Sequence, residues 1–180
     1  MVSKAALEGR GFRPNFSDEY FQVNRKMNEL KLGRRKLSSF WSLDSGVKWL
    51  VFQALLWLPV VTLSLKWWGF KSTQARLCQF FPLRESGKTG DDLVYRVLQV
   101  NQAVRLAAKY YQPWAKCLQQ SLVLWSLLRH QGIESQLQIG VHYEQGEFAA
   151  HAWVEWEGWA INDTQDVRDR YAAFERSLET

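Results

Sequence analysis

The chain has 180 residues, of which 47% are hydrophobic and 23% are charged. This length and apolar content suffice for one domain with a buried core, and they exclude a disordered or fibrous protein. The two cysteines exclude a disulfide-rich mini-protein and a zinc site made of four thiolates. Residues 1–16 contain no apolar segment behind a basic start, so we expect no secretory signal and a cytoplasmic location.

The net charge of +5 comes from the first 48 residues. They contain ten Lys and Arg against five Asp and Glu, whereas the other 132 residues contain thirteen of each kind. The basic cluster at residues 31–36 could contact nucleic acid, acidic lipid or an acidic protein. We interpret it as a solvated arm, expect no nucleic-acid partner, and predict a basic, partly disordered N-terminal segment over residues 1–46.

Residues 47–90 are predicted to form an apolar helical region. The run 49–65 has 17 residues between Lys48 and Lys66 and contains Pro59, whereas a membrane span needs about 20 apolar residues. We therefore favour a buried or interfacial helix, kinked near Pro59, over a span. Its apolar surface has two candidate partners, namely a leader-binding protein, discussed below, and a membrane touched peripherally through residues 49–65.

A second short helix is predicted over residues 72–80, before Pro82. The following linker, residues 84–90, contains Gly-Lys-Thr at 87–89, which is the end of a phosphate-binding loop. That motif needs a further glycine five positions before Gly87, where this chain has Pro82. We therefore predict no nucleotide site and no cofactor.

The remainder, residues 91–180, is predicted to be one domain that opens with two helices. The first is capped by Asp91 or Asp92 and ends near Tyr111, because Pro113 disfavours helical backbone before it. The second helix begins close to Cys117 and ends at Gly132.

The hydrophobic period then changes from helical spacing to two. Strands are predicted over residues 136–143, 148–156 and 159–163, with a short helical tail from about Asp166. This order predicts an α+β fold, in which a helical N-terminal part is followed by a helix packed on an antiparallel sheet.

Cys117 is predicted to open its helix directly after a proline turn. Free backbone N–H groups and the positive end of the helix dipole favour a thiolate at that position, which makes it a candidate nucleophile. The alternative is that Cys117 is a small buried apolar residue. Cys78 lies in the middle of an apolar helix and is interpreted in that second way.

His151 and Asp163 are the other candidate members of a catalytic group. If residues 156–158 form a three-residue hairpin loop, the register pairs His151 with Asp163 and puts both side chains on one face. A two-residue loop pairs His151 with Thr164 and turns Asp163 to the opposite face. In that case Asp166 is the next candidate for the acid.

A nucleophile at a helix start, a histidine on a strand and an acid on the next strand is the chain order of papain-like and transglutaminase-like cysteine enzymes. The motifs Cys-Leu, Gly-Ile, Ile-Gly-Val, His-Ala-Trp-Val and Asn-Asp resemble those of the transglutaminase-like leader peptidases of lasso-peptide biosynthesis. The resemblance covers residues 91–175, with a weaker likeness over residues 47–82. It implies a papain/transglutaminase-like core that carries the nucleophile helix.

The resemblance implies a cysteine endopeptidase that removes the leader from a ribosomally made precursor peptide. Its partners would be that precursor, a separate leader-binding protein and an asparagine-synthetase-like cyclase. Two alternatives remain open: acyl transfer to an amine, as in a transglutaminase, and a non-enzymatic membrane or partner adaptor with a degenerate triad.

Carried onto this chain, the family's triad makes Cys117 the nucleophile, His151 its general base and then acid, and Asp163 the group that orients the imidazole. The Cys117 backbone N–H is one expected oxyanion donor. Further candidates for oxyanion or substrate contacts are Gln112, Trp114 and Trp153. Trp153 and Asn162 are expected to support the site by packing and hydrogen bonding. His130 and His142 lack companions at metal-ligand spacing, so no metal is expected.

Overall fold

The computed structural model describes residues 45–83, 91–112, 114–144 and 147–173. All of them belong to one compact unit of the chain, residues 43–180. The basic cluster at residues 31–36 and the linker 84–90 lie outside the described residues. The predicted division of the chain at residues 46 and 90 stays a prediction.

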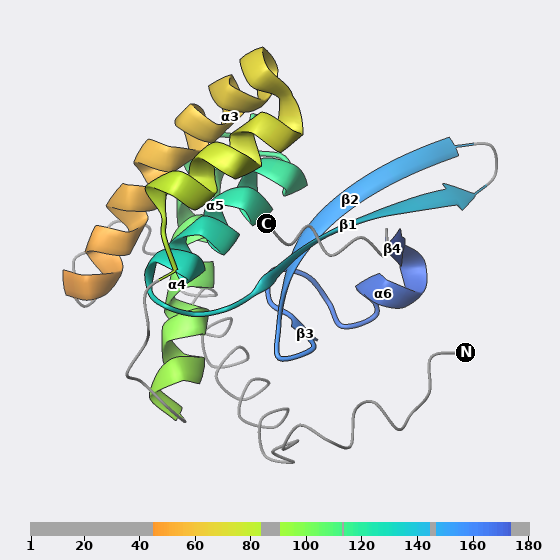
Figure 1. The fold of residues 1–180 in the computed structure, drawn as a ribbon. Coiled ribbons are helices and arrows are strands. Elements are labelled where there is room, and N and C mark those ends of the chain that lie inside the picture. Colours follow the sequence, from red (N-terminus) through yellow and green to blue (C-terminus); the bar gives the residue numbers. More distant parts are fainter. Residues whose placement is uncertain (1–44, 84–90, 113, 145–146, 174–180) are drawn as a thin grey trace. The chain divides into compact units, whose positions relative to one another are not determined.

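Helices and a small antiparallel sheet make up the described part, as an α+β fold requires (Figure 1). The helices are α3 (Ser45–Phe80), α4 (Asp91–Tyr110), α5 (Cys117–His130) and α6 (Val167–Arg170). The strands are β1 (Gln136–Glu144), β2 (Glu147–Trp156), β3 (Trp159–Ala160) and β4 (Ala172–Ala173). The strand order in the sheet is β3-β2-β1-β4, and each neighbouring pair is antiparallel.

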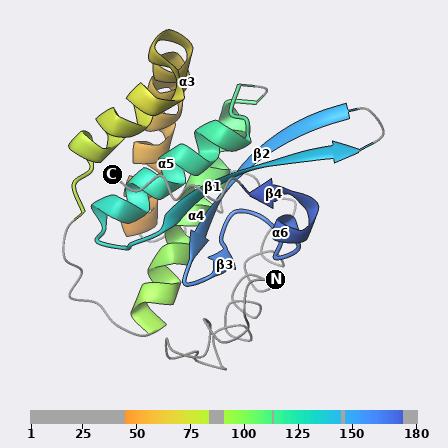
Figure 2. The same ribbon diagram turned by 45° about the vertical axis from the view of Figure 1, so that its right-hand side comes forward.

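Helix α5 is the central element, because it contacts α3, α4 and both long strands (Figure 2). Residues 121–128 are all buried, which is the pattern of a helix surrounded by other elements. The helix ends as predicted. Gly132 takes a left-handed φ of 74°, and the Ile133 N–H donates to the Leu128 carbonyl at 3.0 Å, which satisfies one of the last carbonyls.

Helix α3 is a hairpin of two arms that reverses at Gly69, whose φ of 72° and ψ of −178° are not helical. The ring of Trp57 in the first arm lies 4.7 Å from that of Phe81, just after the second arm. In a straight helix, residues so far apart in sequence would be separated by about 36 Å. The two predicted helices therefore exist, and Figure 1 shows the second arm returning along the first.

The backbone angles stay helical at Pro59, where a kink was predicted, and the break in α3 lies at Gly69. Proline has no N–H to donate to the carbonyl four residues earlier, which is that of Leu55. The hydroxyl of Tyr111, at the end of α4, donates to this carbonyl at 2.9 Å. The proline is therefore accommodated without a break, since a side chain supplies the missing hydrogen bond.

The end of the sheet differs from the prediction in two ways. Glu155 pairs with Ala160 and Trp156 with Trp159. The hairpin loop therefore has two residues, Glu157 and Gly158. Of the two loops considered from the sequence, the three-residue one is wrong. Both loop residues have positive φ, 48° and 82°, as the right-handed twist of a two-residue hairpin favours. In addition, β3 ends at Ala160 rather than at residue 163.

The tail after α6 was predicted to be helical only, but it adds strand β4 to the outer edge of β1. In this pairing Gly140 lies opposite Ala173 and Val141 opposite Ala172. A strand of two alanines carries no hydrophobic alternation, so the sequence period could not reveal it.

We predict that Tyr111→Phe destabilises the protein by about 1–2 kcal/mol, because the Leu55 carbonyl loses its donor. In a Pro59→Ala background, residue 59 regains an N–H that can bond this carbonyl, so the same substitution should cost less than ~0.5 kcal/mol. Urea unfolding of the four proteins measures both costs. An equal cost in the two backgrounds would show that the hydroxyl does not compensate for the proline.

Candidate active site

Cys117 is the first residue of α5 and is half-buried. Lys116 precedes it in an extended conformation and gives the helix no side-chain cap. The first hydrogen bond of the helix runs from the Gln120 N–H to the Lys116 carbonyl at 3.1 Å, so the N–H groups of residues 117–119 have no partner within the helix. These N–H groups can donate hydrogen bonds to an oxyanion at the start of α5.

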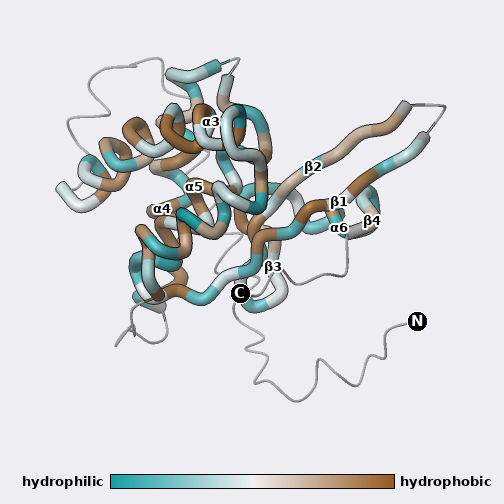
Figure 3. The backbone as a smooth tube through the Cα atoms, turned by 45° about the horizontal axis from the view of Figure 1, so that its top comes forward, coloured by the Kyte–Doolittle hydropathy of each residue, from teal (hydrophilic) through white to brown (hydrophobic). Residues whose placement is uncertain are grey.

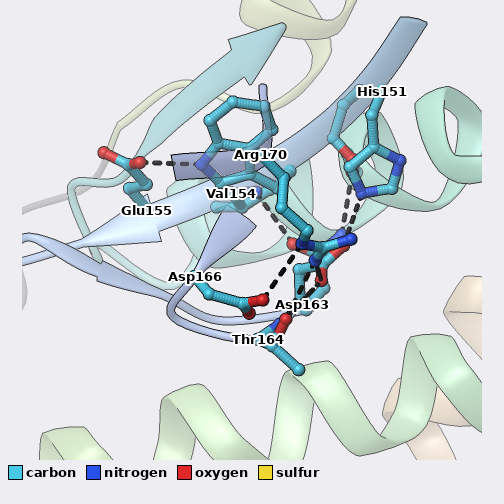
Figure 4. Close-up of polar contacts among 11 residues, drawn as sticks. His151, Val154, Glu155, Asp163, Thr164, Asp166 and Arg170 are labelled. Atoms are coloured by element: carbon cyan, nitrogen blue, oxygen red, sulfur yellow. Dashed lines mark hydrogen bonds and ion pairs between the residues drawn. The ribbon is translucent and has the colours of Figure 1, made fainter. Parts of the chain in front are cut away.

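His151 on β2 contacts Asp163 through its Nε2 atom and the Oδ2 atom of the carboxylate (Figure 4). The two side chains are 23% and 20% exposed, so the pair is partly shielded from water. With Nε2 facing the acid, the Nδ1 atom is the one available for a nucleophile. The structure therefore brings together two of the three residues that were predicted to be catalytic.

Asp163 meets His151 even though the two-residue loop was expected to turn it away. That expectation holds only for a third strand that continues to residue 163. The strand stops at Ala160, and the chain bends over residues 161–163. The backbone is then free of the alternating sheet geometry, and the acid returns to the histidine.

Asn162 fixes this bend to the rest of the protein. Its Oδ1 accepts a hydrogen bond from the Val154 N–H at 2.8 Å, which replaces the next bond of the sheet. Its Nδ2 donates to the Ser121 hydroxyl at 2.8 Å. Ser121 in turn donates to the Ala152 carbonyl at 2.8 Å. We call this set of bonds the Asn162–Ser121 bridge. It joins α5, one turn after Cys117, to β2 beside His151.

The second carboxylate oxygen of Asp163 is also bonded. Oδ1 accepts from the Thr164 N–H at 2.7 Å, from the Thr164 hydroxyl at 3.2 Å and from Arg170 Nη2 at 3.2 Å (Figure 4). Burial raises the pKa of Asp163, but the hydrogen bonds from Thr164 and His151 outweigh it and hold the pKa below its usual 3.8. Asp163 is therefore a carboxylate at neutral pH, able to stabilise a charged imidazole.

Arg170 was not identified from the sequence, because its position seven residues after Asp163 carries no recognisable signal. Besides Asp163, it binds Asp166 Oδ2 through Nε at 3.1 Å. Asp166, the alternative acid considered from the sequence, thus pairs with this arginine. The pKa of Asp166 is lowered chiefly by a hydrogen bond from Thr164, with a smaller contribution from the charge of Arg170.

The imidazole of His151 is one of three neighbouring rings. Trp153 stacks on it at a centroid distance of 6.2 Å, and Tyr171 lies at 5.1 Å, tilted by 31°. The Trp153 and Tyr171 rings are themselves 6.5 Å apart. Gly140 lies opposite His151 on β1, and a Cβ at this position would come within 2.9 Å of both Trp153 Cη2 and Tyr171 Cβ. The glycine of the Ile-Gly-Val motif therefore leaves the space that these two rings occupy beside the histidine. Tyr171 was missed because it lies in the tail that was expected to be helical.

Trp153 is fully buried and serves as a support. Its Nε1 donates to Glu155 Oε1 at 2.7 Å. Glu155 is itself buried and forms a two-point ion pair with Arg168 of α6, whose pKa is raised mainly by this hydrogen bond. Trp153, which the sequence placed at the substrate site, thus holds α6 and β2 together through Glu155.

Other residues singled out in the sequence lie as follows. Gln112 and Trp114 are exposed and precede Cys117 by five and three residues, and their oxyanion roles stay predictions.

Cys78 is half-buried like Cys117. The expectation that it is buried is wrong, because its neighbour Leu77 takes the core-facing position.

The remaining histidines pack against aromatic rings. The His130 ring packs against Phe81 at 5.6 Å, and the His142 ring lies 5.8 Å from Tyr171. Among the described residues, no three His, Cys, Asp or Glu side chains gather where they could hold a metal ion.

We predict that Ser121→Ala destabilises the protein by about 1–3 kcal/mol, because the Asn162–Ser121 bridge is buried and loses both of its serine contacts. Ser126→Ala is the matched control. Ser126 is equally buried on α5 but bonds only the Leu122 carbonyl within its own helix, so its loss should cost less than ~1 kcal/mol. Urea unfolding measures both; equal costs would contradict the role given to the bridge.

Comparison with known proteins gives one match. A family model described as the transglutaminase-like superfamily matches residues 57–176. No curated protein and no solved structure matches the chain. The matched span contains Cys117, His151 and Asp163, together with both arms of the α3 hairpin from Trp57 onward. The chain therefore belongs to the transglutaminase-like superfamily, whose members are usually cysteine proteases or acyltransferases.

Proposed function

We propose that this protein is a cysteine endopeptidase that removes the leader from a ribosomally made lasso-peptide precursor. Membership of the transglutaminase-like superfamily supports the reaction class. The motifs from Cys117 to Asp163, which resemble those of leader peptidases of this pathway, support the substrate.

The observation that carries the proposal is the pairing of His151 Nε2 with the Asp163 carboxylate. A histidine held in this way has its tautomer and ring orientation fixed and can stabilise a positive charge. The Asn162–Ser121 bridge ties the same strand to α5, one turn after Cys117. We assign Cys117, His151 and Asp163 the roles of nucleophile, base and orienting acid.

In the first step the Cys117 thiolate attacks the carbonyl carbon of the last leader residue. The negative charge on the carbonyl oxygen is stabilised by the Cys117 N–H at the start of α5, with Gln112 or Trp114 as the second donor. His151 then gives its proton to the leaving amine of the core peptide. The C–N bond breaks and the leader remains bound to sulfur as a thioester.

In the second step a water molecule attacks the thioester. His151 takes a proton from this water, and Asp163 stabilises the resulting imidazolium. The C–S bond breaks, the leader leaves with a free carboxylate and the thiol is restored. The freed core peptide carries a new N-terminal amine.

The proposed partners follow from this substrate. A separate leader-binding protein would present the precursor, and an asparagine-synthetase-like cyclase would close a ring on the new amine. This chemistry needs no metal or other cofactor, and we propose that it takes place in the cytoplasm.

The second candidate, transfer of the acyl group to an amine, uses the same three residues and the same thioester. The superfamily includes enzymes of both kinds. The acceptor of the second step distinguishes them, since water gives a cleaved leader and an amine gives a conjugated one.

The test is a cleavage assay with the full chain, a lasso-precursor peptide and a leader-binding protein, followed by mass spectrometry. We predict that the free leader and the core peptide both accumulate and that Cys117→Ala lowers the rate by at least ~1,000-fold. Cys78→Ala is the matched control, because Cys78 is also a half-buried helical cysteine. It should keep the full rate.

Three outcomes would overturn the proposal. A leader recovered only as a conjugate of an added amine would identify an acyltransferase. Unchanged cleavage by Cys117→Ala would remove the nucleophile. No turnover of the precursor by the full chain, with folding confirmed by circular dichroism, would return the protein to the adaptor interpretation.

A further inference from the structure

The outer face of the first arm of α3 is a continuous apolar stripe. Six large apolar side chains, each between 44% and 66% exposed, recur along it at intervals of three and four residues. They are Trp49, Phe52, Leu56, Val60, Leu63 and Trp67. We call this set the α3 stripe. Figure 3 shows apolar residues in brown along this helix.

The α3 stripe occupies one narrow side of the helix. At about 100° per residue, its members fall within roughly 80° of one another and extend for about 27 Å. The opposite side contains Leu50, Ala54, Leu58 and Val61, which are buried. Between residues 46 and 65, every exposed position is apolar. A helix face that meets only water would carry charged or polar residues there.

The charged residues of α3 itself have a single sign. Residues 45–83 contain four basic residues and no Asp or Glu. Lys48 and Lys66 are 18 residues apart, which is five full turns, so they lie on the same flank of the helix at the two ends of the stripe. Arg76, in the second arm, lies over the Trp68 ring at 4.1 Å. An apolar strip with tryptophans at both ends and lysines beside them suits the interface of an anionic bilayer.

By length and composition, α3 is the one described helix that could cross a membrane. Its fold argues for a different arrangement. The arm reverses at Gly69 and packs against its own second arm, and Tyr111 bonds the Leu55 carbonyl on its inner side. Crossing a bilayer would require these contacts to break, whereas lying in the plane of the interface leaves them intact.

Self-association is a poorer match for the same face. If two copies paired antiparallel through the α3 stripe, Lys48 of one would lie beside Lys66 of the other at both ends of the contact. No acidic residue of α3 is present to offset this repulsion. Anionic headgroups, in contrast, complement both lysines.

We infer that the α3 stripe docks the protein peripherally on an anionic lipid bilayer, with α3 lying in the plane of the interface. This inference is independent of the proposed peptidase activity. Of the two partners considered from the sequence for residues 49–65, a leader-binding protein and a membrane, it selects the membrane.

The test is flotation of the full chain with vesicles of phosphatidylcholine alone or with about 30% phosphatidylglycerol. We predict binding to the anionic vesicles that is weakened by raising the salt from about 0.1 to 0.5 M. The double variant Phe52→Glu, Leu56→Glu should reduce the bound fraction at least ~10-fold, because it places charge in the middle of the stripe. Lys48→Glu combined with Lys66→Glu should reduce binding to anionic vesicles as well.

Phe148→Glu is the matched control, since Phe148 on β2 is 67% exposed and lies outside α3. It should bind like the unmodified protein. Circular dichroism and urea unfolding check that all variants are folded. The inference is overturned if the folded full chain does not float with anionic vesicles, or if the stripe variant binds as well as the control. Concentration-dependent dimerisation that the stripe variant abolishes would assign the face to a second copy instead.

Discussion

The Asn162–Ser121 bridge is the interaction on which the site depends. A buried serine on α5 and a side-chain amide after β3 connect α5 to β2 and to the bend after β3, which lie 31 and 41 residues further along the chain. Without the amide, the Val154 N–H would lack the partner that a longer third strand would have supplied. With it, the chain can leave the sheet early and present Asp163 to His151.

The position of Asp163 depends on where β3 ends, which the sequence pattern did not predict. The register rule for hairpins was correct as a rule, since a two-residue loop does turn alternate residues to opposite faces. It did not apply to Asp163 because β3 has only two residues. The length of a strand depends on tertiary partners such as the Asn162 side chain, which a pattern of alternating residues does not reveal.

Elements with a strong hydrophobic period were predictable. The start of α5 at Cys117, its end before Gly132 and the long strands β1 and β2 follow the sequence pattern closely. The contacts that refine the site were not predictable, because they join residues without a common period. Arg170 and Tyr171 reach the His151–Asp163 pair from the short segment around α6, where two or four residues of regular structure give no signal.

The α3 hairpin illustrates how one hydrogen bond changes the meaning of a sequence feature. The sequence predicted a kink at Pro59 in a buried or interfacial helix. Because Tyr111 supplies the missing donor, the helix stays intact past the proline and reverses at Gly69 instead. The same helix then buries one side against the domain and leaves the α3 stripe outside.

In the proposed mechanism, Cys117 is a nucleophile activated by its position at the start of α5 and by His151. The most direct measurement is the rate at which limiting iodoacetamide alkylates each cysteine of the folded protein at about pH 6.5, followed by peptide mapping. Cys78 controls for access, because both cysteines are half-buried. We predict that Cys117 reacts at least ~10-fold faster than Cys78 and that His151→Ala removes most of this difference. Equal rates for the two cysteines in the unmodified protein would contradict this mechanism.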